Sequence, residues 1–171
     1  MREILFRGKR IDNGEWVLSG NIISFIPENG EDLIFIPSLS EPCICDHDEN
    51  DNIIAFEKGM FYKVDTKTVG QYTGLNDKNG VNIFEGDIVD LFGMKGKVVQ
   101  ECGAFGIGFM KTIDYDLLES KIPFNNSANF CFNDNFISLW EVFWNYEQDD
   151  NPLYEVEVIG NITDNPELLE K

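Results

Sequence analysis

The sequence predicts a mostly β protein, and three features lead to this fold class. Short runs of strand-forming residues alternate with Gly, Asn, Asp and Pro, as in chains whose strands are joined by turns. Asn-Gly pairs, which favour tight hairpin turns, begin at Asn13, Asn29 and Asn79. Residues 105–109 and 154–158 place apolar side chains at every second position, the period of a strand with one buried face.

The N-terminal part predicts a hairpin-rich β region. Residues 4–7 and 16–18 are strand-forming and flank the turn residues 12–14, so we expect a hairpin there. Further strands are expected at residues 33–36, where Pro37 ends the run, at 53–56 and at 60–64. We therefore place an N-terminal β region at residues 1–65 and a second domain at residues 66–171.

The second domain begins with two turn signals. Asn79-Gly80 lies between strand-forming runs, and we expect a hairpin centred near Gly80 because this dipeptide tolerates the positive φ angles of a tight turn. Gly86-Asp87 precedes the apolar run 88–91, where a sharp bend should lead the chain into a small barrel.

The remaining strands are expected at 97–99, 105–109 and 154–162. Glycines alternate with apolar residues in 105–109, so one face carries no side chains; strong coiling explains this better than close approach of another backbone. Glu155 and Glu157 should face solvent in the last strand. After it, Asn165-Pro166 is typical of a capping residue followed by the first position of a short helical turn.

Three separated segments carry a family resemblance. They are the opening Arg2-Glu3-Ile4-Leu5-Phe6-Arg7, the stretch 69–89 with Gly70-Gln71-Tyr72-Thr73-Gly74 and Phe84-Glu85-Gly86-Asp87, and the tail Gly160-Asn161-Ile162 with Asn165-Pro166-Glu167-Leu168. Together they resemble the YopX family, small proteins encoded by bacteriophages and prophages. The resemblance implies an SH3-like small β barrel in the C-terminal part. Residues 38–52 and the aromatic-rich insert at about 111–150 do not match its pattern.

Charge and composition exclude some classes of function. The chain has 171 residues, and 31 acidic against 13 basic residues give a net charge of -18, which repels the phosphates of nucleic acids. No apolar run approaches the length of a membrane span, and no apolar leader follows Met1. We therefore expect a protein of the bacterial cytoplasm without direct nucleic-acid or membrane contact, and without disulfides among its 4 cysteines.

Two polar clusters offer metal chemistry, and each has a simpler interpretation. Asp46, Asp48, Asn50 and Glu57 fit the spacing of a calcium loop, but Asp51 replaces the glycine that such a loop needs. A polar loop between strands is the favoured interpretation. Cys43, Cys45 and His47 do not have a standard zinc spacing. We expect no cofactor and no metal.

The insert holds a concentration of aromatic residues. Those considered as an interaction surface are Phe124, Phe130, Phe132, Phe136 and Phe143, with Trp140 and Trp144 nearby. Exposed rings would bind a partner, because large apolar patches on proteins usually meet one. Buried rings would form core or a contact between subunits. Core is the favoured interpretation, ahead of self-association and of a foreign partner, and both apolar faces of 139–144 should then be covered.

Catalytic motifs are not apparent. His47 is the single histidine and lies in a polar segment, which disfavours a nucleophilic triad, and no glycine-rich phosphate loop precedes a helix. We therefore expect no enzyme. The leading hypothesis is a phage or prophage accessory protein that acts as an interaction module for a host or phage protein and self-associates as a homo-oligomer. The alternatives are an acidic DNA-mimic-type inhibitor of a host nucleic-acid-binding protein and an enzyme of unrecognised type.

Overall fold

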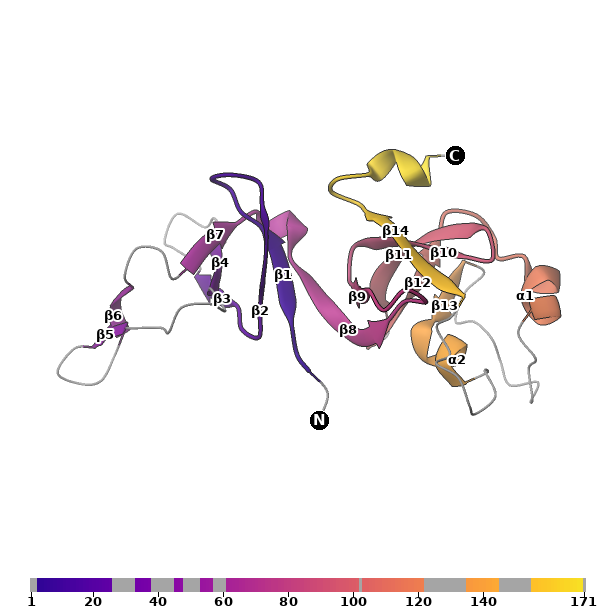
Figure 1. Cartoon of the computed structure of the whole chain (residues 1–171), viewed down its shortest axis with the longest axis horizontal. Helices are drawn as coiled ribbons and strands as arrows, with labels where there is room; N and C mark the ends of the chain where they lie inside the picture. Colours follow the sequence, from indigo (N-terminus) through magenta and orange to yellow (C-terminus); the bar gives the residue numbers. More distant parts are fainter. Residues whose placement is uncertain are drawn as a thin grey trace. The chain divides into compact units, whose positions relative to one another are not determined.

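The computed structural model describes residues 3–25, 33–37, 45–47, 53–56, 61–101, 103–121, 135–144 and 155–170. The chain divides into two compact units, residues 1–72 and 73–171. Antiparallel strands dominate both units (Figure 1), which confirms the predicted mostly β fold class. The division falls within strand β8 (Gly70–Asn76), shortly after the expected boundary at residue 65.

The first unit consists of short antiparallel strands. They are β1 (Phe6–Lys9), β2 (Trp16–Ser19), β3 (Ile23–Phe25), β4 (Leu33–Pro37), β5 (Cys45–His47), β6 (Ile53–Phe56) and β7 (Phe61–Val64), followed by the 3-10 turn η1 (Thr66–Thr68). β1 pairs with β2, which confirms the first predicted hairpin, and also with the start of β8. β4 lies between β3 and β7, and β5 pairs with β6. Gly8 faces the buried Ile36 and Val64, where a Cβ would lie 2.9 Å from Ile36 Cδ1.

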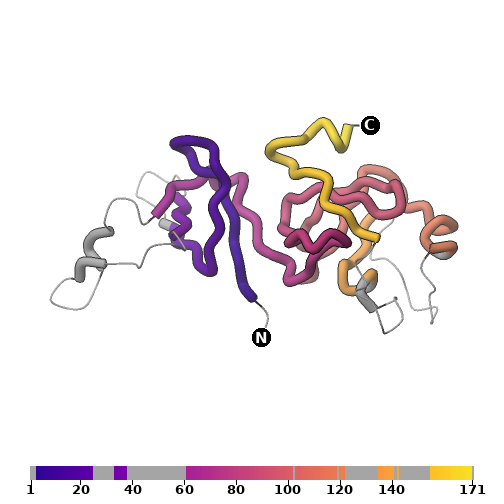
Figure 2. Tube along the Cα trace, viewed as in Figure 1, coloured from indigo at the N-terminus to yellow at the C-terminus, as the bar shows by residue number. Residues whose placement is uncertain are grey.

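The second unit is built around one antiparallel sheet. Its elements are β9 (Asn82–Phe84), β10 (Asp87–Leu91), β11 (Met94–Glu101), β12 (Ala104–Phe109), α1 (Tyr115–Lys121), β13 (Phe136–Ser138), α2 (Leu139–Trp144), β14 (Val156–Asn161) and η2 (Pro166–Leu169). The strand order is β13-β12-β11-β10-β14. Figure 2 shows how the last strand returns beside β10. The core of this sheet includes the fully buried Val89, Leu91, Val98, Ile107 and Val156.

This sheet is not a closed barrel. Among the described residues, hydrogen-bonded pairing runs from β13 to β14 without joining these two edge strands. The expected closure is therefore wrong for this part of the chain. β13 is short and passes directly into α2, which packs against β12 and β13. Because a helix satisfies its backbone groups internally, it offers no strand edge with which the sheet could close.

The helices α1 and α2, in the part of this unit that the structure describes, were not expected from the sequence. In α2, Leu139 and Val142 lie one turn apart on the same side and are each 1% exposed, whereas Trp140 is 61% exposed. The apolar run 139–144 had suggested a segment of sheet with two covered faces. A short continuous apolar run has no period that distinguishes a strand from a helix.

The alternating glycines of β12 make room for an aromatic ring. A Cβ at Gly106 would lie 2.2 Å from Cζ of Phe136, and β12 pairs with β13 so that Gly108 lies opposite Phe136. The sequence favoured coiling of the strand over close approach of a neighbour. The structure shows close approach: the Phe136 ring and the backbone O of Ile137, which would lie 2.5 Å from a Cβ, both occupy the space above Gly106.

Both turn signals of the second domain correspond to turns, with one difference in detail. β8 and β9 are neighbours in a sheet, which confirms the hairpin near Gly80, and Gly86 has a φ of 83° immediately before β10. Gly80 has a φ of 79°, but Asn79 does not have a positive φ, so the turn is longer than the tight form that Asn-Gly favours.

The C-terminal helical turn is present as η2, with Pro166 at its start. Asn165 does not cap it, because its side-chain Oδ1 accepts a hydrogen bond from the backbone N of Asn161 instead, at 3.4 Å. No helix in the described part of the chain is both long and apolar enough to cross a membrane.

Candidate functional site

The metal-ligand candidates fall largely outside the described residues. Asp48, Asn50 and Glu57 lie there, as does Cys43, and of Asp46 in β5 only the backbone is described. Where the structure does describe side chains, no three metal-ligating groups come together. The calcium and zinc interpretations are therefore not tested.

Some of the aromatic candidates also lie outside the described residues, and others lie within them. Phe124, Phe130 and Phe132 lie outside the described residues, and so does the side chain of Phe143. Phe136 is only 3% exposed, since its ring lies over Gly106. Phe136 is thus a buried core residue.

A groove that the sequence did not indicate lies at one end of the five-stranded sheet. Its first hollow, of about 320 Å³, lies between the β10–β11 turn, the end of β12, residues 110–114 and η2. The apolar part of the lining consists of Met94, Phe109, Met110, Ile113, Leu168 and Leu169. A volume of this size is at the lower end of the range for ligand pockets, and it accommodates one large side chain.

A second hollow, of about 310 Å³, shares Phe109 and Met110 with the first and extends over β11 and β12 towards Asn135. Gly108 and Val99 belong to its lining, and a Cβ at Gly108 would lie 3.4 Å from Val99 Cγ2. Met110 is 62% exposed where the two hollows meet. We call the two hollows together the Met110 groove.

Three lysines surround the Met110 groove. Lys95 and Lys111 line the first hollow and Lys97 lines the second. All three are exposed, and none forms an ion pair or a side-chain hydrogen bond within the described residues. Residues 73–171 contain 18 acidic residues and only 6 lysines, and of the described lysines Lys121 also lacks an ion pair whereas Lys78 has one. Three lysines of this acidic unit thus gather at the groove, beside two acidic residues of its lining.

The acidic residues at the groove are Asp114 and Glu101. Asp114 Oδ1 accepts a hydrogen bond from the backbone N of Leu117 at 2.9 Å, which satisfies a free N–H in the first turn of α1. One oxygen of the Asp114 carboxylate is therefore engaged by the helix, while the residue still lines the first hollow.

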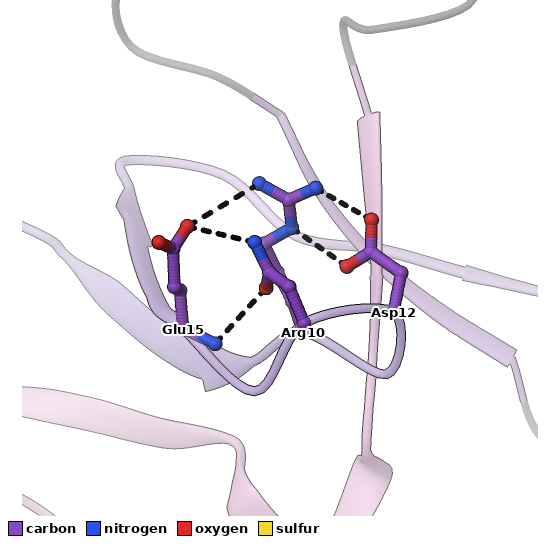
Figure 3. Close-up of polar contacts among 4 residues, drawn as sticks. Arg10, Asp12 and Glu15 are labelled. Atoms are coloured by element: carbon purple, nitrogen blue, oxygen red, sulfur yellow. Dashed lines mark hydrogen bonds and ion pairs between the residues drawn. The ribbon is translucent and has the colours of Figure 1, made fainter.

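A different charged cluster stabilises the first hairpin (Figure 3). The Arg10 guanidinium donates to both carboxylate oxygens of Asp12, with Nε 2.9 Å from Oδ1, and lies 3.7 Å from Glu15 Oε2. It also stacks over Tyr62, 4.0 Å from the ring centroid. The hydrogen bonds from Arg10 lower the pKa of Asp12 below its usual 3.8. Each charge in this cluster has a partner. The cluster therefore stabilises the turn and is not a candidate binding site.

The comparisons with known proteins place the chain in a family. The sequence profile described as "YopX protein" matches residues 5–170. The chain belongs to the YopX family. Among solved structures, this family member is similar to the one titled "Crystal structure of protein EF1440 from Enterococcus faecalis", with 21% identity over 97% of each chain and a TM-score of 0.43. No curated protein matches the chain.

In this YopX chain, the stretch 69–89 has a structural role. Asp77 is 1% exposed, and its Oδ1 accepts hydrogen bonds from the backbone N of Asn79 and of Val81, at 2.7 and 2.9 Å. Asp87 is 2% exposed and accepts from the backbone N of Phe84 at 2.7 Å. These buried carboxylates are used to hold turns, which leaves the Met110 groove as the best candidate site.

Sequence reasoning missed the groove because its residues come from distant segments. Leu168 and Leu169 belong to the tail, Met94 to β11 and Ile113 to the segment before α1. The one local signal was the spacing of Lys95 and Lys97, which places two cations on the same face of a strand.

Proposed function

We propose that this YopX protein is a non-enzymatic, phage-encoded accessory protein that binds another protein through the Met110 groove. The observation that carries the proposal is the conjunction of exposed Met110 with three lysines that have no acidic partner among the described residues. Methionine adapts its shape to different partners because it is unbranched and polarisable. Apolar surface that is rimmed by polar residues is typical of protein–protein interaction sites.

The groove chemistry favours binding over catalysis. Its charged groups are three exposed lysines, the exposed Glu101, and Asp114, which is engaged in capping α1. Nucleophilic or acid–base catalysis requires a reactive group held next to a second group that activates it. The groove residues that the structure describes contain no such pair of groups.

The strand order of the second unit supports an SH3-like scaffold in open form. β10 to β13 follow one another as neighbours, and the last strand, β14, pairs with the first of them, β10. Small β folds of this kind commonly present binding surfaces on loops that a rigid sheet positions. We propose that the second unit is an open relative of such a barrel, with the groove at one end.

Affinity capture with matched variants tests the proposal. Full-length wild type, Met110→Glu and Val81→Glu are used to capture proteins from bacterial lysate, and recovery is quantified by mass spectrometry. Val81 is the control because it is 47% exposed and lies outside the groove. We expect proteins that bind wild type and Val81→Glu but not Met110→Glu, because a carboxylate there removes the apolar contact of Met110 and competes for the neighbouring lysines.

Two outcomes would contradict this function. Equal recovery by all three proteins would show that binding does not use the groove. Equal recovery that also falls steeply with added salt would favour the acidic DNA-mimic alternative, in which the -18 charge attracts a nucleic-acid-binding protein.

A further inference from the structure

We propose that the Met110 groove binds an extended acidic peptide segment that carries one large apolar side chain. The inference rests on the proposed function and names the chemistry of the partner. Lys95, Lys97 and Lys111 remain without acidic partners among the described residues, although acids outnumber lysines threefold in residues 73–171. By contrast, Lys78 in the same unit lies 2.6 Å from Glu157. Among the described lysines of this unit, four have no acidic partner, and three of these four line the groove, the fourth being Lys121.

The spacing of two of the lysines matches an extended peptide. Lys95 and Lys97 are two residues apart on β11 and both exposed. Residues i and i+2 of a strand project from the same face about 7 Å apart. Acidic side chains at every second position of an extended peptide have the same separation. A peptide that runs along β11 would thus place successive acids beside successive lysines.

The first hollow provides the apolar anchor site. Met94, Phe109 and Leu169 belong to its lining, and Lys95 and Lys111 line it as well. Aliphatic and thioether groups bind apolar side chains without directional requirements. A Phe or Leu of the peptide would enter this hollow. The acidic side chains on either side of that residue would pair with the lysines.

Nucleic acid is the competing occupant, and the lining disfavours it. Single-stranded nucleic acid binds to exposed aromatic faces on which bases stack. The aromatic rings of the groove belong to Phe109 and Phe136, and both are at most 5% exposed. The net charge of -18 also repels a polyanion more strongly than it repels a short peptide with few charges.

The test uses defined peptides rather than an unknown partner. A fluorescent peptide with Glu at alternate positions around one central Phe is titrated with the full chain at about 0.15 M salt, where the Debye length is about 8 Å and distant charges are screened. Matched peptides replace every Glu by Gln or the Phe by Ser. A thymidine oligonucleotide of the same charge serves as competitor. Binding is measured by fluorescence anisotropy.

Matched lysine variants assign the site. The variant Lys95→Gln, Lys97→Gln, Lys111→Gln is compared with Lys63→Gln, Lys67→Gln, Lys121→Gln, which removes the same charge from exposed lysines outside the groove. We expect the groove variant to bind the Glu/Phe peptide about tenfold more weakly, and the control variant to bind it as wild type does. The Gln and Ser peptides should also bind wild type more weakly.

Several results would overturn the inference. They are no binding of the Glu/Phe peptide at up to about 1 mM protein, an equal loss in both lysine variants, or displacement of the peptide by the oligonucleotide. If the peptides fail while Met110→Glu still abolishes capture from lysate, the peptide chemistry is wrong and the proposed function stands. If Met110→Glu captures the same proteins as wild type, the proposed function itself is wrong.

Discussion

Asp77 Oδ2 accepts a hydrogen bond from the backbone N of Val158 at 3.0 Å, across 81 positions of sequence. The neighbouring Lys78 donates its backbone N to Val156 O at 3.0 Å, and its Nζ lies 2.6 Å from Glu157. The turn after β8 is thus joined to β14 by two hydrogen bonds and one ion pair. Gly86 O, in the same family-like stretch, accepts from the backbone N of Ile162. These contacts connect the 69–89 stretch to the family-like tail.

Replacing Asp77 by Asn should destabilise the second unit. The carboxylate accepts three backbone N–H groups, and an amide would present its own N–H group to at least one of these donors. We expect a loss of about 1–3 kcal/mol, the cost of a buried polar group without a partner. Urea unfolding measures the change. Asp116→Asn, at an exposed position in α1, should stay close to wild type, and equal loss in both variants would contradict this role.

Adding a methyl group at Gly106 should crowd the ring of Phe136. A Cβ there would lie 2.2 Å from Phe136 Cζ, so Gly106→Ala should cost about 1–3 kcal/mol. Combined with Phe136→Leu, the substitution should cost less than the sum of the two single changes, which a double-mutant cycle of unfolding measures. Gly20→Ala is the control, because its Cβ would meet only Ile4 O at 3.5 Å. Strict additivity would refute the contact.

The Arg10–Asp12 pair should contribute to stability at neutral pH and not in strong acid. Hydrogen bonds from Arg10 hold the pKa of Asp12 below 3.8, so the contribution is present above that value and is lost as pH falls through the lower pKa of the folded protein. Asp12→Asn should therefore melt below wild type at pH 7, and the difference should shrink as pH falls below 3.8. A difference that does not change with pH would argue against this ionic contribution.

The Lys78–Glu157 pair should show the opposite pH dependence. A hydrogen bond to Glu157 raises the pKa of Lys78 above 10.5, so its contribution is present below that value and is lost as pH rises through the raised pKa. Lys78→Gln should lower the melting temperature slightly at neutral pH, because the pair is partly exposed. The difference from wild type should close in strong alkali. Lys121→Gln provides an exposed control with the same change of charge.

Local patterns predicted the strands and turns well. The first hairpin, the turn at Gly86 and the helical turn after Asn165 depend on neighbouring residues, and each is present. The helix at 139–144 was not predicted, because its alignment with the core depends on where β12 and β13 lie. The burial of Phe136 also depends on a partner, since the glycine that receives its ring is 30 residues away.

The sequence by itself determined the mostly β fold class, the turn positions and the family. These properties depend on side-chain period, on glycine φ and on residue order, all of which are local. Tertiary structure alone decided that the sheet stays open, that Asp77 holds β14, and that Lys95, Lys97 and Lys111 surround one groove. Contacts between distant segments depend on how strands pair and pack, and no short window of sequence contains that information.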